Sequence, residues 1–413
     1  QQFCSSCASA WGARTKNARR KRYRPTVSFG ALDRRAVASV ATQFFVNGAT
    51  FASFIPRLPE IRDRIDVSTG VLGVLMTTAL VLGLAGSLIS GWVLNRFGTR
   101  LTLIGGAALL VLTLPLIGFA MTPIVFVLAL GLMAALDVVV DVSMNLQGSW
   151  LSARRHAPIM NRLHGLWSLG AVVGGLTAAR LTASNVSLQT HLVGVSLVLS
   201  VAVVFVGRGL LRTDEHVEEQ AVSPGSKAVA NRLPLILLAV GGALAISVEL
   251  VSNDWAAFRL ADDFSTSAGF AGLGFVAFTS GMTIGRFSGD TLQLRLGHHC
   301  LGRRSAIAAT IGLAGAALIP NEYAVLASYV LAGIGVSTFF PKLYDDAAQL
   351  PGKRGVGLAA LTAGSRISGL VVPAVIGALA STSLSVGAAT GIIVIPSALA
   401  FAVLTYYSPE PQR

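Results

Sequence analysis

Apolar stretches of about twenty residues recur along the whole chain, and shorter polar segments separate them. A helix needs about 20 predominantly apolar residues to cross the ~30 Å hydrocarbon core of a bilayer. The pattern predicts twelve spans, at residues 37–56, 69–93, 101–119, 123–148, 161–181, 190–207, 233–257, 268–290, 304–320, 322–346, 356–379 and 384–407. The predicted fold class is therefore an all-α polytopic membrane protein.

The longest polar stretch inside this array covers residues 208–232 and combines charged residues with proline and glycine. Because it falls near the middle of the chain, we interpret it as a cytoplasmic linker between two six-helix halves. The predicted domains are a basic cytoplasmic N-terminal tail (1–35), a first bundle (36–207), the linker (208–232), a second bundle (233–407) and a cytoplasmic C-terminal tail (408–413).

Composition and charge agree with a membrane protein. The chain is 53% hydrophobic and 12% charged, whereas about 25% charged residues are usual in soluble domains. Its net charge of +13 is divided between the N-terminal tail and many short loops, which argues against a nucleic-acid partner. With the N-terminus in the cytoplasm, most of the 32 Lys and Arg residues fall on that side. The positive-inside rule therefore predicts a multi-pass protein with both termini in the cytoplasm.

The two halves resemble each other at one constant offset. The segment NRFGTR (95–100) aligns with LRLGHH (294–299), which places Gly98 on Gly297. At the same offset, SLGAVVGG (168–175) aligns with ISGLVVPA (367–374). Parallel repeats are typical of transporters in which two helical bundles surround a site near the middle of the membrane.

The segment GWVLNRFGTR (91–100), between the second and third spans, resembles the signature G-x-x-x-D-R-x-G-x-R of the major facilitator superfamily. This resemblance implies two pseudo-symmetric six-helix bundles with a cytoplasmic gate. The gate residues are Gly91, Arg96, Gly98 and Arg100, with Asn95 in place of the usual Asp, and a looser second copy holds Gly289, Asp290, Arg295 and Gly297. With Asn95, a charge pair in the gate becomes a neutral hydrogen bond.

Two longer stretches narrow the resemblance. Residues 141–175 and VELVSNDWAAFRL (248–260) are similar to a bacterial subgroup distantly related to the fucose permeases. This subgroup includes inner-membrane proteins and proposed transporters of rhizopine, an amino-inositol derivative, so the resemblance implies a place in the cell inner membrane. The resemblance therefore implies that the chain carries a sugar, a polyol or an amino-inositol such as rhizopine.

Two carboxylates interrupt the fourth span. Asp137, Asp141 and Asn145 follow one another at four-residue spacing, so they share one face of a helix. A charge that faces lipid costs a few kcal/mol on insertion scales, so this face is expected to turn toward protein or water. These residues could carry protons or bind solute, or they could make structural contacts between helices.

Further polar residues inside the spans are candidates for the same cavity. Gln43 and Asn47 lie one turn apart in the first span, and Glu249 and Asn253 lie one turn apart in the seventh. Amides beside aromatic side chains suit the hydroxyl groups and apolar faces of a polyol. Hydrogen bonding between helices is the alternative for each pair.

Four residues in other spans complete the candidates. Histidine titrates near physiological pH, so His164 could relay protons or could pack between helices. Trp167, near it in the fifth span, could stack on a sugar ring, although packing is favoured. Arg366 is predicted as a counter-ion for the carboxylates, whereas Arg286, four residues before Asp290, is assigned to the gate.

The sequence favours a secondary active transporter that moves a small polar solute by alternating access, coupled to protons. It lacks the Walker A pattern of ATP-driven proteins and the HExxH and GxSxG patterns of two enzyme classes, so no enzyme activity is expected. The expected partners are the solute, protons and the lipid bilayer, with no cofactor or metal, and the protein is expected to be a monomer. Drug or metabolite efflux and non-transporting solute sensing remain alternatives.

Overall fold

The computed structural model describes residues 31–155, 159–211, 232–348 and 356–407. Throughout these ranges the chain is helical apart from short turns. Most of the predicted N-terminal tail, most of the predicted linker and the predicted C-terminal tail lie outside the described residues.

Among its described residues, the first half contains six α-helices and one 3₁₀ turn. These are α2 (Ala31–Ala52), η1 (Ile55–Arg57), α3 (Leu58–Arg64), α4 (Thr69–Gly118), α5 (Pro123–Arg155), α6 (Met160–Ala183) and α7 (Leu188–Gly209). The helix α2 begins six residues before the first predicted span because its first turns carry polar and charged residues. The apolar pattern therefore marks the membrane-crossing part of α2 and misses its start.

The second half repeats this order. Its helices are α8 (Leu233–Asp254), α9 (Ala256–Phe264), α10 (Ala268–Ala271), α11 (Leu273–Leu296), α12 (His298–Leu318), α13 (Glu322–Val336), α14 (Phe339–Ala348), α15 (Val356–Ala380) and α16 (Val386–Tyr407). The tenth predicted span is thus divided into α13 and α14. Pro341 explains the break, because its ring clashes with the carbonyl group four residues earlier, that of Ser337.

Each predicted span corresponds to helical structure. Among the described residues, nine helices are long and apolar enough to cross a membrane, and α4, with 50 residues, holds two of the predicted spans. The helices α2 and α12 are less apolar, yet they pack within the two bundles in the same way as the others. The prediction of an all-α polytopic fold is confirmed.

The two spans inside α4 join at Gly98, which has φ 71° and ψ 160°. The aligned residue of the second half, Gly297 between α11 and α12, has φ 82° and ψ 159°. This backbone region is essentially restricted to glycine. The same conformation at both aligned glycines supports an internal duplication.

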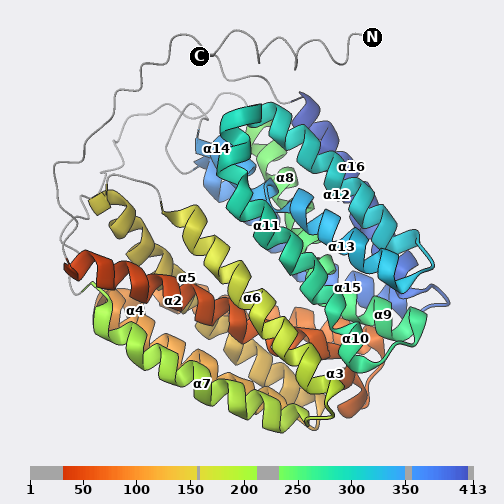
Figure 1. The fold of residues 1–413 in the computed structure, drawn as a ribbon, viewed down its shortest axis with the longest axis horizontal. Helices are drawn as coiled ribbons and strands as arrows, with labels where there is room; N and C mark the ends of the chain where they lie inside the picture. Colours follow the sequence, from red (N-terminus) through yellow and green to blue (C-terminus); the bar gives the residue numbers. More distant parts are fainter. Residues whose placement is uncertain (1–30, 156–158, 212–231, 349–355, 408–413) are drawn as a thin grey trace.

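The two halves lie side by side with their long helices running in one general direction (Figure 1). The helices α3, α9 and α10 gather at one end of the molecule, here called the α3–α9 end, and α14 lies toward the opposite end, the α14 end. Contacts between the halves come mainly from α4 against α15 and from α6 against α11. These two helix pairs form the seam between the halves.

Glycines allow the seam to close tightly near the α3–α9 end. A Cβ atom on Gly73 of α4 would lie 2.4 Å from the carbonyl oxygen of Pro373 on α15. A Cβ on Gly70 would lie 2.3 Å from the hydroxyl of Ser381. Small residues permit this close approach of helix backbones in a membrane.

A buried arginine holds the α3–α9 end of the first half together. Arg57 is 4% exposed, and its Nε and Nη2 atoms donate to the two carboxylate oxygens of Glu60 at 2.7 and 2.9 Å. Nη2 also donates to the carbonyl oxygen of Val186 at 3.0 Å, and Nη1 lies 3.2 Å from His191 Nδ1. Every nitrogen of this guanidinium therefore has a partner.

Arg259 has the corresponding place in the second half. It is 6% exposed and donates to Asp263 at 2.5 Å and to the carbonyl oxygens of Ala316 and Ile319 at 3.1 and 3.0 Å. Asp263 in turn accepts from two backbone N–H groups at the start of α16 at 2.8 and 2.7 Å. The guanidinium of Arg259 is again fully used, so both arginines have structural roles.

Candidate functional site

Three helices of the first half meet in a hydrogen-bonded chain at the level of Asp137. Asn47 on α2 donates from Nδ2 to Oδ1 of Asp137 on α5 at 2.8 Å. The indole Nε1 of Trp167 on α6 donates to Oδ1 of the same amide at 2.7 Å. Asn47 is 2% exposed, and its one amide group makes hydrogen bonds to both the carboxylate and the indole. Buried polar groups need such partners.

A guanidinium from the second half extends this chain across the seam. Arg286 on α11 donates from Nη1 to the hydroxyl of Ser168 on α6 at 2.5 Å and from Nη2 to Glu249 on α8 at 3.4 Å. Its Cζ atom lies 5.8 Å from the centre of the Trp167 ring. The residues Asn47, Asp137, Trp167, Ser168, Glu249 and Arg286 are called the seam cluster below. They connect the two halves through polar contacts.

More carboxylate and hydroxyl groups lie beside the seam cluster. Asp141 is exposed and accepts from Asn145 Nδ2 at 2.9 Å. Tyr344 on α14, also exposed, is within electrostatic reach of both Asp141 and Glu249. Tyr344 is therefore near carboxylates of both halves.

The remaining candidates have separate surroundings. Gln43 is fully buried, and its side-chain atoms have no hydrogen-bond partner within the described residues. His164 is exposed and meets the ring of Phe44 edge-on at 5.2 Å between centroids. Asn253 is partly buried beside the seam cluster's Glu249, one turn away on α8.

The two arginine candidates, Arg286 and Arg366, do not make the contacts that the sequence led us to expect. Arg286, assigned to the gate from its spacing to Asp290, lies in the seam cluster because α11 turns this position toward α6. The side chain of Asp290 lies outside the described residues. Arg366 is exposed and donates to the hydroxyl of Ser87 on α4 at 2.8 Å, so it bonds across the seam to a hydroxyl rather than to a carboxylate.

The gate residues of the first half contact their own half. Arg100 donates to the carbonyl oxygen of Gly207 near the end of α7 at 2.6 Å, a favourable place for a cation because helix C-termini are negative. Arg96 is exposed and lies 5.9 Å from the Phe97 ring, and Asn95 is exposed as well. In this conformation the motif therefore holds α4 to α7 through Arg100.

The glycines of the motif differ in what they require. A Cβ on Gly91 or on Gly289 would meet open space, whereas Gly98 and Gly297 are required by their positive φ. Arg295, the arginine of the second copy, is exposed. The turn glycines are therefore the positions at which the two copies agree most closely.

An ion pair joins the halves at the α3–α9 end. Arg62 on α3 donates to the two oxygens of Asp262 on α9 at 2.6 and 3.2 Å, and its Cζ lies 5.3 Å from the Phe258 ring. Burial lowers the pKa of Arg62, but hydrogen bonds to Asp262 and Asp63 raise it above its ordinary value. The cation is therefore permanent at this contact, which we call the α3–α9 ion pair.

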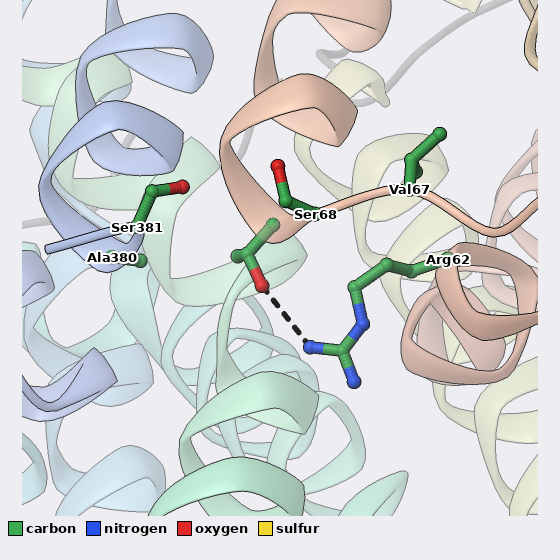
Figure 2. Close-up of a pocket in the computed structure, with 6 residues that line it drawn as sticks. Arg62, Val67, Ser68, Ala380 and Ser381 are labelled. Atoms are coloured by element: carbon green, nitrogen blue, oxygen red, sulfur yellow. Dashed lines mark hydrogen bonds between the residues drawn. The ribbon is translucent and has the colours of Figure 1, made fainter.

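A cavity of about 360 Å³ opens beside the α3–α9 ion pair, lined by Arg62, Val67, Ser68, Thr69, Ala380 and Ser381. Figure 2 shows Arg62 reaching across it to the hydroxyl of Thr69, a bond of 3.1 Å. Its walls come from the α3–α4 connection of the first half and from α15 of the second. The cavity therefore lies at the seam, on the side away from α14.

The sequence analysis did not predict four residues that link the halves or lie near the seam cluster. These are Ser168 of the seam cluster, Tyr344 beside it, and Arg62 and Asp262 of the α3–α9 ion pair. A serine or tyrosine in a span gives little signal by itself, because both are common in helices. Arg62 and Asp262 are 200 residues apart. Their opposite charges at corresponding places after the first and seventh spans were the available signal.

Two packed helical halves, which meet at a glycine-lined seam with a polar cluster between them, define a polytopic helical membrane protein. The chain belongs to the Major Facilitator Superfamily, whose family model matches residues 40–344. This is a family of transporters, so the chain is a membrane transporter of solutes and not an enzyme.

Similar proteins agree with this assignment. The membrane protein MosC of Rhizobium meliloti is 27% identical over 384 residues, which cover 91% of this chain and 92% of MosC. A mutant of the nucleoside transporter NupG superposes with a TM-score of 0.69 at 12% identity, covering 91% of this chain and 99% of that one. A variant of the E. coli fucose:proton symporter FucP has a TM-score of 0.59 at 15% identity, covering 91% and 98%. The two structures share the fold.

Proposed function

We propose that this protein is a secondary active transporter that moves a small polar solute through the seam cluster and couples the movement to protons. The observation that carries the proposal is the chain of polar contacts from Asp137 through Asn47 and Trp167 to Arg286. It crosses between the two halves, which also meet through the α3–α9 ion pair and through the hydrogen bond from Arg366 to Ser87. Polar and ionisable groups inside a membrane are costly, and they mark substrate and ion pathways.

The carboxylates support proton coupling. Asp137 accepts its hydrogen bond from the neutral amide of Asn47, and no cation bonds to it within the described residues. Asp141 likewise bonds to the amide of Asn145. Taking up a proton removes a charge that has no ion-pair partner, so each carboxylate is suited to carry a proton between the two sides of the membrane.

The open and closed ends of the molecule support alternating access. The α3–α9 ion pair and the Gly73 contact close one end, whereas Asp141, His164 and Tyr344 are exposed, and Tyr344 lies on α14 at the opposite end (Figure 1). In the orientation proposed from the charge distribution, the closed end is periplasmic and both termini are cytoplasmic. The conformation described here then corresponds to the inward-facing state.

The solute class rests on the groups around the seam cluster and on similar structures. Amide, hydroxyl and indole groups suit a solute with several hydroxyl groups. NupG is a nucleoside transporter and FucP is a fucose:proton symporter. We therefore place hydroxylated solutes, including sugars and amino-inositols such as rhizopine, first among the candidates.

Proton flux in proteoliposomes tests this proposal. Purified protein is reconstituted with a pH-sensitive dye and challenged with fucose, nucleosides, inositols, amino-inositols and cationic drugs. We expect proton movement with a hydroxylated solute, its loss in Asp137→Asn or Asp141→Asn, and its retention in Asp66→Asn. Asp66 is an exposed control with φ 53°, a conformation that Asn tolerates.

Two results would overturn the proposal. Proton movement only with cationic drugs would indicate efflux. Solute binding without flux of solute or protons would indicate a sensor.

A further inference from the structure

Arg286 is bonded less completely than Arg57 and Arg259, the buried arginines among the described residues. In Arg57, the Nε and Nη2 atoms form one edge of the guanidinium, and this edge holds both oxygens of Glu60 at 2.7 and 2.9 Å. In Arg286, the same edge makes one contact with Glu249, at 3.4 Å from Nη2, and Nε has no partner within the described residues. Charge-assisted N–H···O bonds are normally about 2.7–2.9 Å long. The Nε–Nη2 edge of Arg286 is therefore only weakly hydrogen-bonded.

The position of this edge points to a ligand. The side chain of Arg286 is 18% exposed and that of Glu249 is 15% exposed, so both lie inside the seam rather than at a surface. Nη1 is fixed by Ser168 and the ring of Trp167 lies 5.8 Å from Cζ. These contacts hold the guanidinium in place, while its Nε–Nη2 edge has two nearly parallel donors. That edge is the geometry that binds a carboxylate through two hydrogen bonds.

Proton coupling would make this edge available. When Glu249 binds a proton, it no longer balances the charge of Arg286, whose remaining contacts are a hydroxyl and an aromatic ring. A half-buried cation is costly without a compensating anion. The other titratable groups near this pair include His164 on α6, within electrostatic reach of Arg286, and Tyr344 on α14, within reach of Glu249. Neither is an anion at neutral pH. The carboxylates of Asp137 and Asp141 bond to Asn47 and Asn145 and not to Arg286, so a carboxylate on the solute would supply the compensating charge directly at the guanidinium.

We infer that the solute bound at the seam cluster carries a carboxylate, which replaces Glu249 at the Nε–Nη2 edge of Arg286. The inference rests on the proposed function, because it assigns a substrate class to the same site. Among the hydroxylated solutes proposed above, the inference ranks acids, such as sugar acids, ahead of neutral sugars and amino-inositols, because only the acids carry the group that Arg286 would select.

Equilibrium binding to the full-length protein in nanodiscs tests the inference. The probes are matched sets that differ in one group: glucose, glucuronate and glucosamine, and also ribitol with ribonate and glycerol with glycerate. We expect a carboxylate to bind at least about tenfold more tightly than its neutral counterpart, as for a charge-assisted bond. Arg286→Gln should remove this preference, and Arg286→Lys should keep part of it. Quenching of Trp167 fluorescence, absent in Trp167→Phe, would place the bound solute at the cluster.

Arg304→Gln is the matched control, since Arg304 is an exposed arginine on α12 outside the cluster. Size-exclusion chromatography establishes whether Arg286→Gln folds, and Arg286→Lys supplies the second variant if it does not. Equal or absent binding of the carboxylates, or an unchanged preference in Arg286→Gln, would overturn the inference.

Uptake measurements separate the inference from the proposed function. Proton-coupled uptake of a neutral solute that persists in Arg286→Gln would refute the carboxylate and leave the transporter proposal standing. Arg286-dependent carboxylate binding without uptake or proton flux would support the inference and refute proton-coupled transport.

Discussion

Removing the α3–α9 ion pair should open that end of the transporter. The proposed changes are Arg62→Gln, Asp262→Asn and the two combined. The Arg62 side chain is 15% exposed and that of Asp262 is 28% exposed, so the pair lies between a surface pair and a buried one. Exposed pairs contribute about 0.2–1 kcal/mol, and hydrogen bonds to charged groups contribute about 1.5–3 kcal/mol. We therefore expect the ion pair to stabilise the closed conformation by about 1–2 kcal/mol.

That free energy applies only to conformations in which α3 touches α9. Losing 1–2 kcal/mol changes an equilibrium by about 5–30-fold, so the ratio of open to closed molecules should rise by this factor. Spin labels on Val67→Cys and Ser381→Cys, which face the same cavity from the two halves, report the distance across the seam. The three cysteines of the chain are replaced first, so that the spin labels attach only at the two introduced positions.

The double variant tests whether the pair itself is responsible. If the two side chains act together, the effect of the double variant should be smaller than the sum of the single effects by the energy of the pair. Arg64→Gln is the control, because Arg64 bonds to Gly118 within its own half. Unchanged distance distributions, or strictly additive single effects, would refute the reasoning.

Three further predictions concern packing and the polar chain. Gly73→Ala should raise the open population in the same spin-label assay, because the added Cβ would lie 2.4 Å from a carbonyl oxygen of α15. Gly105→Ala on the same helix is the control, because its Cβ meets open space and should leave the open population unchanged. Arg259→Gln should lower the free energy of unfolding by about 3–5 kcal/mol, measured by thermal unfolding in detergent, because it leaves a buried carboxylate without its cation; an unchanged melting temperature would contradict this. Asn47→Ala should lower stability by about 1–3 kcal/mol and alter the emission of Trp167, because it removes the acceptor of the indole N–H; an unchanged spectrum would show that this bond is absent in the membrane.

The spans could be predicted because their signal is local. Each is a run of apolar residues as long as the membrane is thick, and the turn at Gly98 depends on a single residue. The break in the tenth span was also foreseeable from Pro341. The start of α2 was missed because its polar first turns carry no apolar pattern.

The partners of the site residues could not be predicted, because they depend on how the halves pack. Arg286 and Asp290 share a helix face, and this local spacing gave no information on which element lies opposite Arg286. Gln43 and Asn47 are also one turn apart, yet only Asn47 meets polar groups, on α5 and α6. Sequence spacing identifies the face of a helix, and the tertiary packing decides what that face meets.

The glycine turns at Gly98 and Gly297 have a consequence for biosynthesis. Each joins two membrane spans with no intervening loop, so the second span of the pair emerges from the ribosome directly after the first. In the proposed topology both turns stay on the cytoplasmic side, so the tip of each hairpin never has to cross the bilayer. A side chain at either glycine would strain the turn, and we expect it to hinder the folding back of the second span during insertion.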